Sequence, residues 1–397
     1  MSQKNDNRSV LIYEPNVEGH HIGYLRFISE SLLGAGFKVA LAIDTRPEAF
    51  PRIQEQMAEL LGRVQVLSAW GDSVHPRKDK LSCVADCLEK SGADSVFLTT
   101  FDEIASPLFR QAALGLMPPA SLRGKLGGIY MRPRFLAGPG LSPNLWIKAR
   151  GFTRLLSRGW FRQLLFLDPF LAAQLKEKHP RAPGFFLPDP FPDDFTADRT
   201  EARLKLGVPA GRQVLLFYGG AYRRKGLHLA VQAMLNLPES SPAFLLCAGL
   251  QPKDSRVARD LEKLAAQKRA VFINRYVTTD EEKMVFAACD FVLLPYLNHF
   301  GSSGVLARAA GAGRPVIASD EQLVGRLVRK YGLGPLFATG HVPALRQAIS
   351  QAASAPPAAL ARWQAGARAF AKECSRSAFQ TALVAAIEAG FNHAAPK

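Results

Sequence analysis

The stretch GGAYRRKG, residues 219–226, joins glycines to consecutive cations. It follows an apolar run, Val214–Tyr218, which is typical of a buried strand, and it precedes a helical pattern. Its turn and its charge come from Gly219, Gly220, Arg223, Arg224 and Lys225. Backbone N–H groups at a helix start bind phosphate well when cations are near, so we predict a phosphate site here. The alternative is a solvated basic turn, and the Walker A spacing is absent.

A second loop, within HFGSSGVLARAAGAGRPVIAS (residues 299–319), has the same pattern of turn and helix start. Its polar turn is formed by Gly301, Ser302, Ser303 and Gly304. Serine hydroxyls and N–H groups there could hold a second anionic group, such as a diphosphate; the alternative is a serine N-cap with glycines for the turn. Arg308 lies one turn into the predicted helix, and Gly313 and Pro315 end it.

Two segments of the first half carry candidate ligand-binding groups, with Gly19 predicted on the donor side and the others on the acceptor side. In EPNVEGHHIGYLRFISESLL (residues 14–33), Gly19 opens a loop, and His20 and His21 begin an amphipathic pattern. We predict that His20 binds a sugar hydroxyl or donates to phosphate, with a helix cap as the alternative. In TTFDEIAS (residues 99–106), Asp102 and its neighbour Glu103 could bind acceptor hydroxyls or serve as a base. The alternative is acidic charge in a first helical turn, which is favourable anyway.

A basic stretch covers residues 145–168 and has no acid before its last position. Its arginines are spaced by four, at Arg150, Arg154, Arg158 and Arg162. Such a basic amphipathic helix can lie on an anionic membrane. The alternative is a surface helix whose arginine stems cover apolar neighbours.

The candidate groups lie between short apolar runs, which predict strands, separated by segments long enough to form helices. The runs are Val10–Tyr13, Lys38–Ile43, Val64–Ala69, Ser95–Thr99, Gly127–Met131, Leu164–Leu167, Gly184–Leu187, Val214–Tyr218, Ala243–Ala248, Val271–Ile273, Phe291–Leu294 and Pro315–Ala318. This alternation predicts an α/β fold with two doubly wound, Rossmann-like domains facing each other across a cleft. A proline-rich segment, residues 187–195, reads as the linker. We therefore expect an N-terminal acceptor-side domain (1–190), a C-terminal nucleotide-sugar domain (191–375) and a final helix (376–397) returning to the first.

Composition narrows the class of partner. The 397 residues carry a net charge of +16, which favours anionic partners, but no basic tail or nucleic-acid reader motif is present. Five cysteines without a signal-peptide pattern fit a reducing cytosol. We find no run apolar enough to span a membrane, so we expect a cytoplasmic protein, peripheral on the inner face of the membrane.

The second half resembles the family-4, retaining glycosyltransferases of GT-B fold. The resemblance rests on YGGAYRRKGLHLAVQAM, FINRYVTTDEEKMVFAACDFVLLPY and SSGVLARAAGAGRPVIAS, in the order and spacing of the family. It implies a nucleotide-diphosphate-sugar donor bound mainly by the C-terminal domain, no metal or other cofactor, and front-face attack assisted by the leaving phosphate. The alternative is a degenerate relative that binds nucleotide-sugar or glycan as a partner of an active enzyme.

The resemblance also assigns roles to residues. Lys225 matches the family lysine on the donor phosphates, and Gly220 stands where the family has an arginine, so Arg223 or Arg224 substitutes. Asn274, Arg275 and Tyr276 match the loop whose backbone faces the nucleobase. The loop from Gly301 to Gly304 matches the one beside the donor sugar and diphosphate. Two family glutamates, eight positions apart, correspond to Phe300 and Arg308. The second usually binds ribose hydroxyls; since arginine has no acceptor, we expect Arg308 to contact the diphosphate or another anion.

Overall fold

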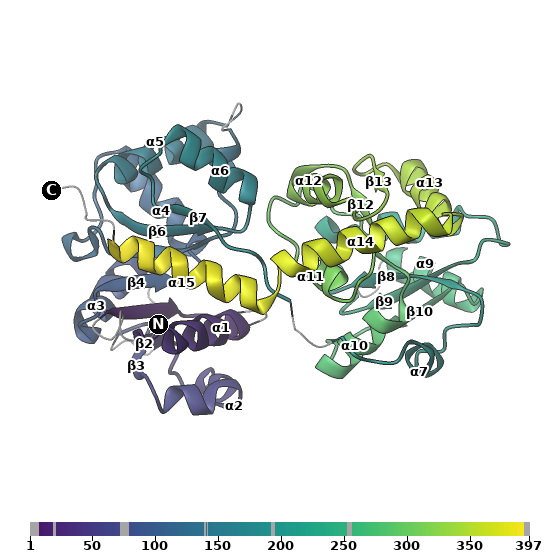
Figure 1. Cartoon of the computed structure of the whole chain (residues 1–397), viewed down its shortest axis with the longest axis horizontal. Coiled ribbons are helices and arrows are strands. Elements are labelled where there is room, and N and C mark those ends of the chain that lie inside the picture. The colour runs from purple at the N-terminus through teal and green to yellow at the C-terminus, as the bar shows by residue number, and fades with distance from the viewer. Residues whose placement is uncertain are drawn as a thin grey trace. The chain divides into compact units, whose positions relative to one another are not determined.

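Two parallel sheets organise the chain, which we describe from a computed structural model. The structure describes residues 8–18, 21–71, 79–138, 140, 142–191, 195–251 and 256–392. The chain divides into unit 1, residues 1–188 and 379–397, and unit 2, residues 189–378. The prediction of two doubly wound α/β domains is confirmed (Figure 1).

Unit 1 holds a parallel sheet of order β3-β2-β1-β4-β5-β6-β7. Its strands are β1 (Ser9–Glu14), β2 (Lys38–Ile43), β3 (Gln65–Ser68), β4 (Ser95–Leu98), β5 (Leu126–Tyr130), β6 (Phe161–Phe166) and β7 (Gly184–Phe186). Its helices are α1 (His21–Gly34), α2 (Phe50–Leu61), α3 (Lys80–Ser91), α4 (Asp102–Ala113), α5 (Pro143–Ser157), α6 (Pro169–Lys178) and α15 (Arg376–Asn392). Two 3₁₀ turns, η2 (Ala120–Leu122) and η3 (Arg134–Ala137), complete it.

Helices cover both faces of this sheet. The strand residues that point to either face are apolar, so each face needs a covering layer. Leu11 and Tyr13 of β1 share one core with α3, α4, α5 and α6. Val10 and Ile12 point the other way, into a core with α1, α2 and α15. Figure 1 shows α15, in yellow, lying in unit 1 beside the elements of the N-terminal half, and its Phe379 packs edge-on against Tyr24 of α1.

Unit 2 holds a sheet of order β10-β9-β8-β11-β12-β13. Its strands are β8 (Gln213–Tyr218), β9 (Ala243–Ala248), β10 (Ala270–Ile273), β11 (Phe291–Leu294), β12 (Val316–Ser319) and β13 (Leu336–Phe337). Its helices are α7 (Arg199–Lys205), α8 (Leu227–Leu235), α9 (Arg256–Ala266), α10 (Thr279–Ala288), α11 (Gly304–Gly311), α12 (Gln322–Tyr331), α13 (Val342–Ala353) and α14 (Pro357–Glu373), with the 3₁₀ turn η4 (Arg223–Lys225). Leu215 of β8 shares a core with α8, α9 and α13.

Local sequence explains where several helices begin. The Asp79, Asp168 and Asp198 carboxylates each accept backbone N–H groups at the start of α3, α6 and α7. Thr278 and Glu281 form a capping box at α10. These caps fix the loops that leave the carboxyl ends of the strands.

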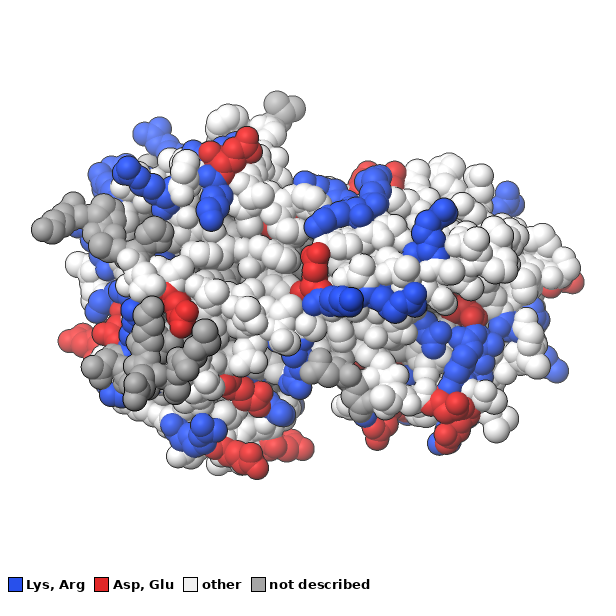
Figure 2. Space-filling view, viewed as in Figure 1, with Lys and Arg blue, Asp and Glu red and all other residues white. Residues whose placement is uncertain are grey.

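Lys and Arg do not gather in one patch on the visible face. Figure 2 shows them scattered over both units and interspersed with Asp and Glu. On this face, the positive charge is therefore not focused in one patch.

Candidate functional site

Each sheet reverses its strand order once, and the polar clusters lie there. In unit 1 the reversal lies between β1 and β4, and in unit 2 it lies between β8 and β11. Open α/β sheets bind ligands outside the carboxyl ends of strands at this point. Tyr218 ends β8, and Pro295 and Tyr296 follow β11. We therefore take this edge of unit 2 as the candidate donor site.

Lys225 joins the two glycine loops of unit 2. Its Nζ donates to the Tyr296 hydroxyl over 3.1 Å and lies 4.8 Å from the centre of that ring. The Tyr296 hydroxyl lies 3.0 Å from Ser303 Oγ, and Ser303 caps α11 by accepting from the Leu306 N–H. No carboxylate lies within ion-pair distance of Lys225 in the described part of the chain. Its charge is therefore available to an anionic ligand.

Arg224 makes a second connection between the same loops. Its guanidinium lies 3.0 Å from His299 Nδ1, and His299 Nε2 lies 2.9 Å from the Ser302 carbonyl oxygen. Ser302 Oγ donates to Asp189 over 2.8 Å. Residues predicted from separate motifs, Arg224 and Ser302, thus meet at one edge of the sheet.

Glycine backbones allow these loops to approach closely. Gly226 has φ +76°, and a Cβ there would lie 1.8 Å from the Pro295 carbonyl oxygen. Gly219 has φ +96°, and its carbonyl oxygen would lie 2.5 Å from a Cβ on Gly249. Gly304 is the first residue of α11, and a Cβ on it would meet the Arg308 guanidinium at 3.1 Å. Gly220 and Gly301 lie in the same two loops.

Arg308 is engaged by an acid of its own unit, and its contact with a donor anion stays a prediction. Its Nε donates to Glu282 Oε1 over 3.0 Å, and another of its N–H groups donates to the Gly304 carbonyl oxygen. The Tyr218 hydroxyl donates to the other Glu282 oxygen. Burial, reinforced by Glu282, raises the pKa of Tyr218, so this phenol stays a donor. A carboxylate thus lies beside Arg308, on α10 rather than α11.

The loop after β10 carries the residues matched to nucleobase recognition. Asn274 accepts the Gln251 N–H over 2.7 Å, which joins the loops after β9 and β10. Arg275 pairs in two-pronged fashion with Glu281, and this pairing lowers the Glu281 pKa to about 2. Tyr276 is 82% exposed. The exposed ring is free of the core and available to a ligand.

In unit 1, a buried acid organises the reversal point. Glu14 is 1% exposed, and one of its oxygens accepts from the Thr99 hydroxyl and lies 2.8 Å from His21 Nδ1. Its other oxygen accepts the Asn16 N–H. Asn16 in turn donates to Glu103, which Lys80 also contacts at 2.6 Å. The cluster supplies hydroxyl-binding groups at the edge expected for the acceptor.

The His21–Glu14 pair predicts a pH-dependent contribution to stability. The hydrogen bond to Glu14 raises the pKa of His21 above its ordinary value of 6.5. A histidine whose pKa is raised in the folded state contributes its full stabilisation below pH 6.5. This contribution disappears as the pH rises through the pKa of the folded state. We expect His21→Gln to lower the Tm more at pH 5.5 than at pH 9. Glu30→Gln, which breaks the exposed Arg26–Glu30 pair on the same helix, should show no such difference; equal pH dependence in both variants would refute the assignment.

The other site predictions of the first half have different outcomes. Gly19 and His20 lie outside the described residues. The Asp102 carboxylate accepts the Met131 and Arg132 N–H groups over 2.7 and 3.0 Å, so it anchors the segment after β5. Burial raises its pKa, against these hydrogen bonds. A catalytic role for His20 or Asp102 stays a prediction.

The prediction of one basic helix through residue 162 is wrong. Helix α5 ends at Ser157, because Gly159 has φ +67° and β6 begins at Phe161. Arg162 therefore belongs to a strand, where it donates to the Gly124 carbonyl oxygen and covers the Phe391 ring. Arg150, Arg154 and Arg158 remain along one side of α5 and its C-cap, on the stripe that begins with Trp146, which is 60% exposed.

The residues that the structure describes contain neither a metal-binding cluster nor a membrane-spanning helix. No group of three His, Cys, Asp or Glu side chains there is arranged to hold a metal. None of the helices described is long and apolar enough to cross a membrane.

Sequence reasoning missed Glu14, Tyr296, Asp189 and Glu282 as members of these clusters. Glu14 and Tyr296 could have been found, because each follows a predicted strand within two residues. Asp189 and Glu282 had no such signal, since their partners lie far away in sequence.

Residues 212–355, from β8 to the end of α13, match the protein family described as "Glycosyl transferases group 1". A D-inositol 3-phosphate glycosyltransferase of Xylanimonas cellulosilytica is 33% identical over 210 residues, 50% of this chain and 48% of that protein. The chain thus matches about half the length of this curated relative.

Solved structures resemble the whole chain. Sucrose-phosphate synthase from Thermosynechococcus elongatus superposes with a TM-score of 0.68 at 16% identity, covering 97% of this chain and 100% of that one. HepE of Anabaena, solved with UDP-glucose, superposes with a TM-score of 0.65 at 16% identity, covering 96% and 99%. At this identity the likeness shows the fold, which is that of the GT-B glycosyltransferases.

Proposed function

We propose that this protein is a nucleotide-sugar-dependent glycosyltransferase of family-4, retaining type. It transfers a sugar from a nucleotide-diphosphate donor to a glycan or lipid-linked acceptor in cell-surface polysaccharide or glycolipid synthesis. The observation that carries the proposal is the Lys225–Tyr296–Ser303 chain of hydrogen bonds. It joins two glycine loops at the strand reversal of unit 2, inside the segment matched to a glycosyltransferase family.

The charges at this edge suit a diphosphate leaving group. Lys225 and Arg224 supply cations, and the start of α11 directs free N–H groups and the positive end of its dipole to the same place. Preorganised positive charge stabilises the negative charge that develops on a departing diphosphate. These groups do the work of a divalent cation, so the proposed reaction uses no metal and no cofactor besides the donor.

The transfer step itself needs few groups. The bond between the sugar C1 and the β-phosphate oxygen breaks, and an acceptor hydroxyl attacks C1 from the same face. The proton of that hydroxyl passes to the departing phosphate oxygen. We assign the acceptor to the edge of unit 1, where His20 and Asp102 are the predicted catalytic groups and Glu14 and His21 add hydroxyl-binding capacity. An inositol phosphate belongs in the acceptor panel because a relative is named for one.

The donor ribose needs a hydrogen-bond acceptor that Arg308 cannot supply. Glu282 is a carboxylate in contact with Arg308, and it accepts from Arg308 and Tyr218 with lone pairs to spare. We expect Glu282→Gln to reduce the preference of the protein for UDP over 3′-deoxy-UDP by about tenfold, the worth of one charged hydrogen bond. Calorimetric titration of both nucleotides measures it. Glu262→Gln on the exposed side of α9 is the control; an unchanged preference in Glu282→Gln would exclude this role.

Membrane contact is proposed for α5 alone, at the cytoplasmic face. Arg150, Arg154 and Arg158 would face anionic lipid, with Trp146 as the interfacial aromatic. We expect the protein to co-sediment with phosphatidylglycerol vesicles, and Arg150→Gln with Arg154→Gln to weaken this about 30-fold. Arg329→Gln, in unit 2, is the control. Equal partitioning onto neutral and anionic vesicles would show that the α5 arginines do not bind anionic lipid.

Titration with UDP-, GDP- and ADP-sugars tests the donor, and product analysis with a matched acceptor tests the transfer. Binding to none of them by folded protein would refute the proposal. A second candidate function is binding of the nucleotide-sugar without turnover. It is favoured by Arg308 and Phe300, which stand at the positions of the two family glutamates. Donor binding without transfer or donor hydrolysis favours that candidate, whereas transfer that disappears in Lys225→Ala excludes it.

A further inference from the structure

Asp189 brings a negative charge to the proposed donor loop. It is the first residue of unit 2, and its Oδ2 accepts from the Ser302 hydroxyl over 2.8 Å. The same oxygen would lie 4.0 Å from a Cβ on Gly304, the first residue of α11. An acid of the chain therefore lies at the start of α11, where the proposed function puts the donor diphosphate.

Apolar contacts hold the segment around Asp189 on unit 2. Phe191 is 8% exposed, and a Cβ on Gly311, the last residue of α11, would lie 2.5 Å from its ring. The centre of the Phe195 ring lies 6.2 Å from that of Phe191 and 5.5 Å from that of Phe286 in α10. Because these contacts do not involve the carboxylate, we expect variants of Asp189 to keep their fold.

The Ser302 hydroxyl has a single proton to donate. In this structure the proton goes to Asp189, whereas the proposed donor site needs it for a phosphate oxygen. The two hydrogen bonds exclude each other, because the proton can lie along only one of them at a time. A donor that uses Ser302 must therefore displace the Asp189 carboxylate.

Charge opposes a diphosphate at the same place. A Cβ on Gly304 would lie 3.1 Å from Arg308 Nη1, and Arg308 in turn pairs with Glu282 over 3.0 Å. Two acids and one base, namely Asp189, Glu282 and Arg308, thus lie near the start of α11, and together they are net negative. Since like charges repel, this cluster opposes the approach of a diphosphate to the cations of the donor loops.

The charge of Asp189 also acts on the interior of unit 2. Cys374, at the end of α14, is 3% exposed. Burial raises the pKa of the Cys374 thiol, and the Asp189 carboxylate adds to that effect. A charge that acts on a buried group is screened less by water and salt than a charge on an exposed surface. The repulsion between Asp189 and a phosphate is therefore stronger than that of an exposed pair.

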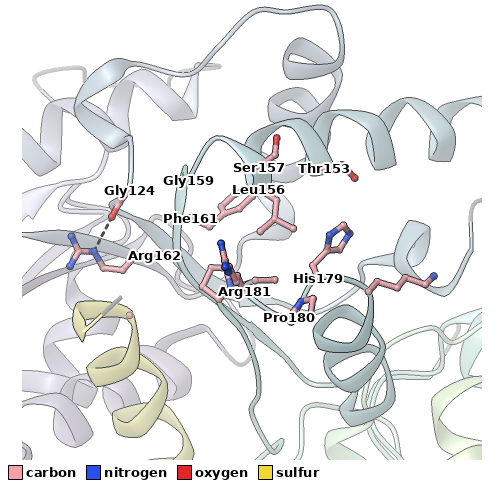
Figure 3. Close-up of a pocket in the computed structure, with 14 residues that line it drawn as sticks. Gly124, Thr153, Leu156, Ser157, Gly159, Phe161, Arg162, His179, Pro180 and Arg181 are labelled. Atoms are coloured by element: carbon pink, nitrogen blue, oxygen red, sulfur yellow. Dashed lines mark hydrogen bonds between the residues drawn. The ribbon is translucent and has the colours of Figure 1, made fainter. Parts of the chain in front are cut away.

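A cavity of unit 1 is also lined by cations, but they do not converge. Its volume is about 870 Å³, and Arg162, Lys178 and Arg181 are among its lining residues. Figure 3 shows Arg162 bonded to the Gly124 carbonyl oxygen, away from Arg181. That arrangement gives no reason to expect a second diphosphate site, so Lys178 serves as a control cation outside the donor site.

We propose that Asp189 is an internal competitor of the donor diphosphate and thereby sets the affinity of the donor site. The carboxylate holds the Ser302 proton beside α11 until a donor arrives. The hydrogen bond from Ser302 to Asp189 then breaks, and one from Ser302 to a phosphate oxygen forms. This inference rests on the proposed donor site and adds a residue that opposes binding there. The competition depends on the phosphate charge of the ligand, and not on its base.

Calorimetric titration of wild type and Asp189→Asn with UDP, UMP and uridine tests the proposal. Asparagine keeps the size of the side chain and removes its charge. We expect UDP to bind about tenfold more tightly to the variant, and UMP to gain less, because the repulsion grows with the charge of the ligand. Uridine should bind equally to both proteins. A merely structural role of Asp189 would instead give a loss of affinity for all three ligands.

Ser302→Ala separates the hydrogen bond from the charge. In that background, the gain in UDP affinity from Asp189→Asn should fall to about threefold or less, since the competing bond is already gone and only the repulsion remains. Two controls change one charge elsewhere. Glu262→Gln removes an acid from the exposed side of α9, and Lys178→Gln removes a cation from the unit 1 cavity. Neither should change UDP affinity by more than about twofold.

UDP affinity that is unchanged or lower in Asp189→Asn, with the fold intact by circular dichroism, would overturn the competitor and leave the donor site in place. So would an equal gain in Glu262→Gln, an equal gain for uridine, or a gain that Ser302→Ala does not reduce. If Asp189→Asn unfolds, Asp189→Ser gives the same comparison. UDP binding to neither wild type nor any variant would instead remove the donor site itself, and the competitor with it.

Discussion

If Lys225 binds the donor diphosphate as proposed, replacing it with alanine should lower the affinity for a UDP-sugar by about 10- to 100-fold, the worth of 1.5–3 kcal/mol for a hydrogen bond to a charged group. The reason is the place of this ammonium. Its Nζ donates to the Tyr296 hydroxyl and lies over the Tyr296 ring, at the end of the loop before α8, with no ion-pair partner within the described residues. Its removal takes away the central charge opposite the diphosphate. Isothermal titration calorimetry of wild type and variant measures the loss.

Lys205→Ala is the matched control for that experiment. Lys205 lies in the same unit, is 59% exposed and pairs with Glu201 one helical turn away. It should change nucleotide affinity by less than about twofold, since exposed ion pairs contribute little. Unchanged binding in Lys225→Ala, or an equal loss in both variants, would show that Lys225 does not bind the donor.

Gly226→Ala should destabilise unit 2 by about 3 kcal/mol, from a left-handed backbone and an overpacked contact together. The residue has φ +76°, and its new Cβ would lie 1.8 Å from the Pro295 carbonyl oxygen. Because the loops of β8 and β11 must separate to relieve that contact, Lys225 also moves away from Tyr296. We expect a weaker donor complex as well as a lower urea midpoint.

Gly313→Ala isolates the backbone part of this effect. Its φ of +65° is similar, but nothing lies within 4 Å of a Cβ there. It should cost only about 1 kcal/mol and leave nucleotide affinity unchanged. Equal destabilisation of both variants in urea unfolding would mean that the close approach of the two loops does not matter.

Most of the fold could be predicted from the sequence because buried parallel strands are short, nearly continuous apolar runs. Each predicted apolar run corresponds to a strand, with ends that differ by up to three residues, as at β6. The strand β13 was missed because its two residues, Leu336 and Phe337, are too short to form a pattern. The prediction of a helix over residues 145–162 was wrong. The arginines keep their spacing of four past Gly159, but the helical backbone ends at Ser157.

The candidate donor site was predictable as loops but not as contacts. Glycines, serines and cations after strands mark where an anion binds, so Lys225 and Ser303 could be found separately. Their connection through Tyr296 required the fold. The partner of Arg308 was invisible for the same reason: Glu282 lies 26 residues earlier, on another helix, as one of three consecutive first-turn acids.

The return of α15 to unit 1 has a consequence for the order in which the protein matures. Residues 189–378 form unit 2 without interruption, whereas unit 1 is built from both ends of the chain. Phe379, Leu383 and Ile387 occupy the same core as Val10 and Ile12 of the first strand. On a ribosome that builds from the N-terminus, this face of the unit 1 sheet is covered by α1 and α2 alone until residues 379–392 have emerged. The second unit to be synthesised is thus the first that can finish folding.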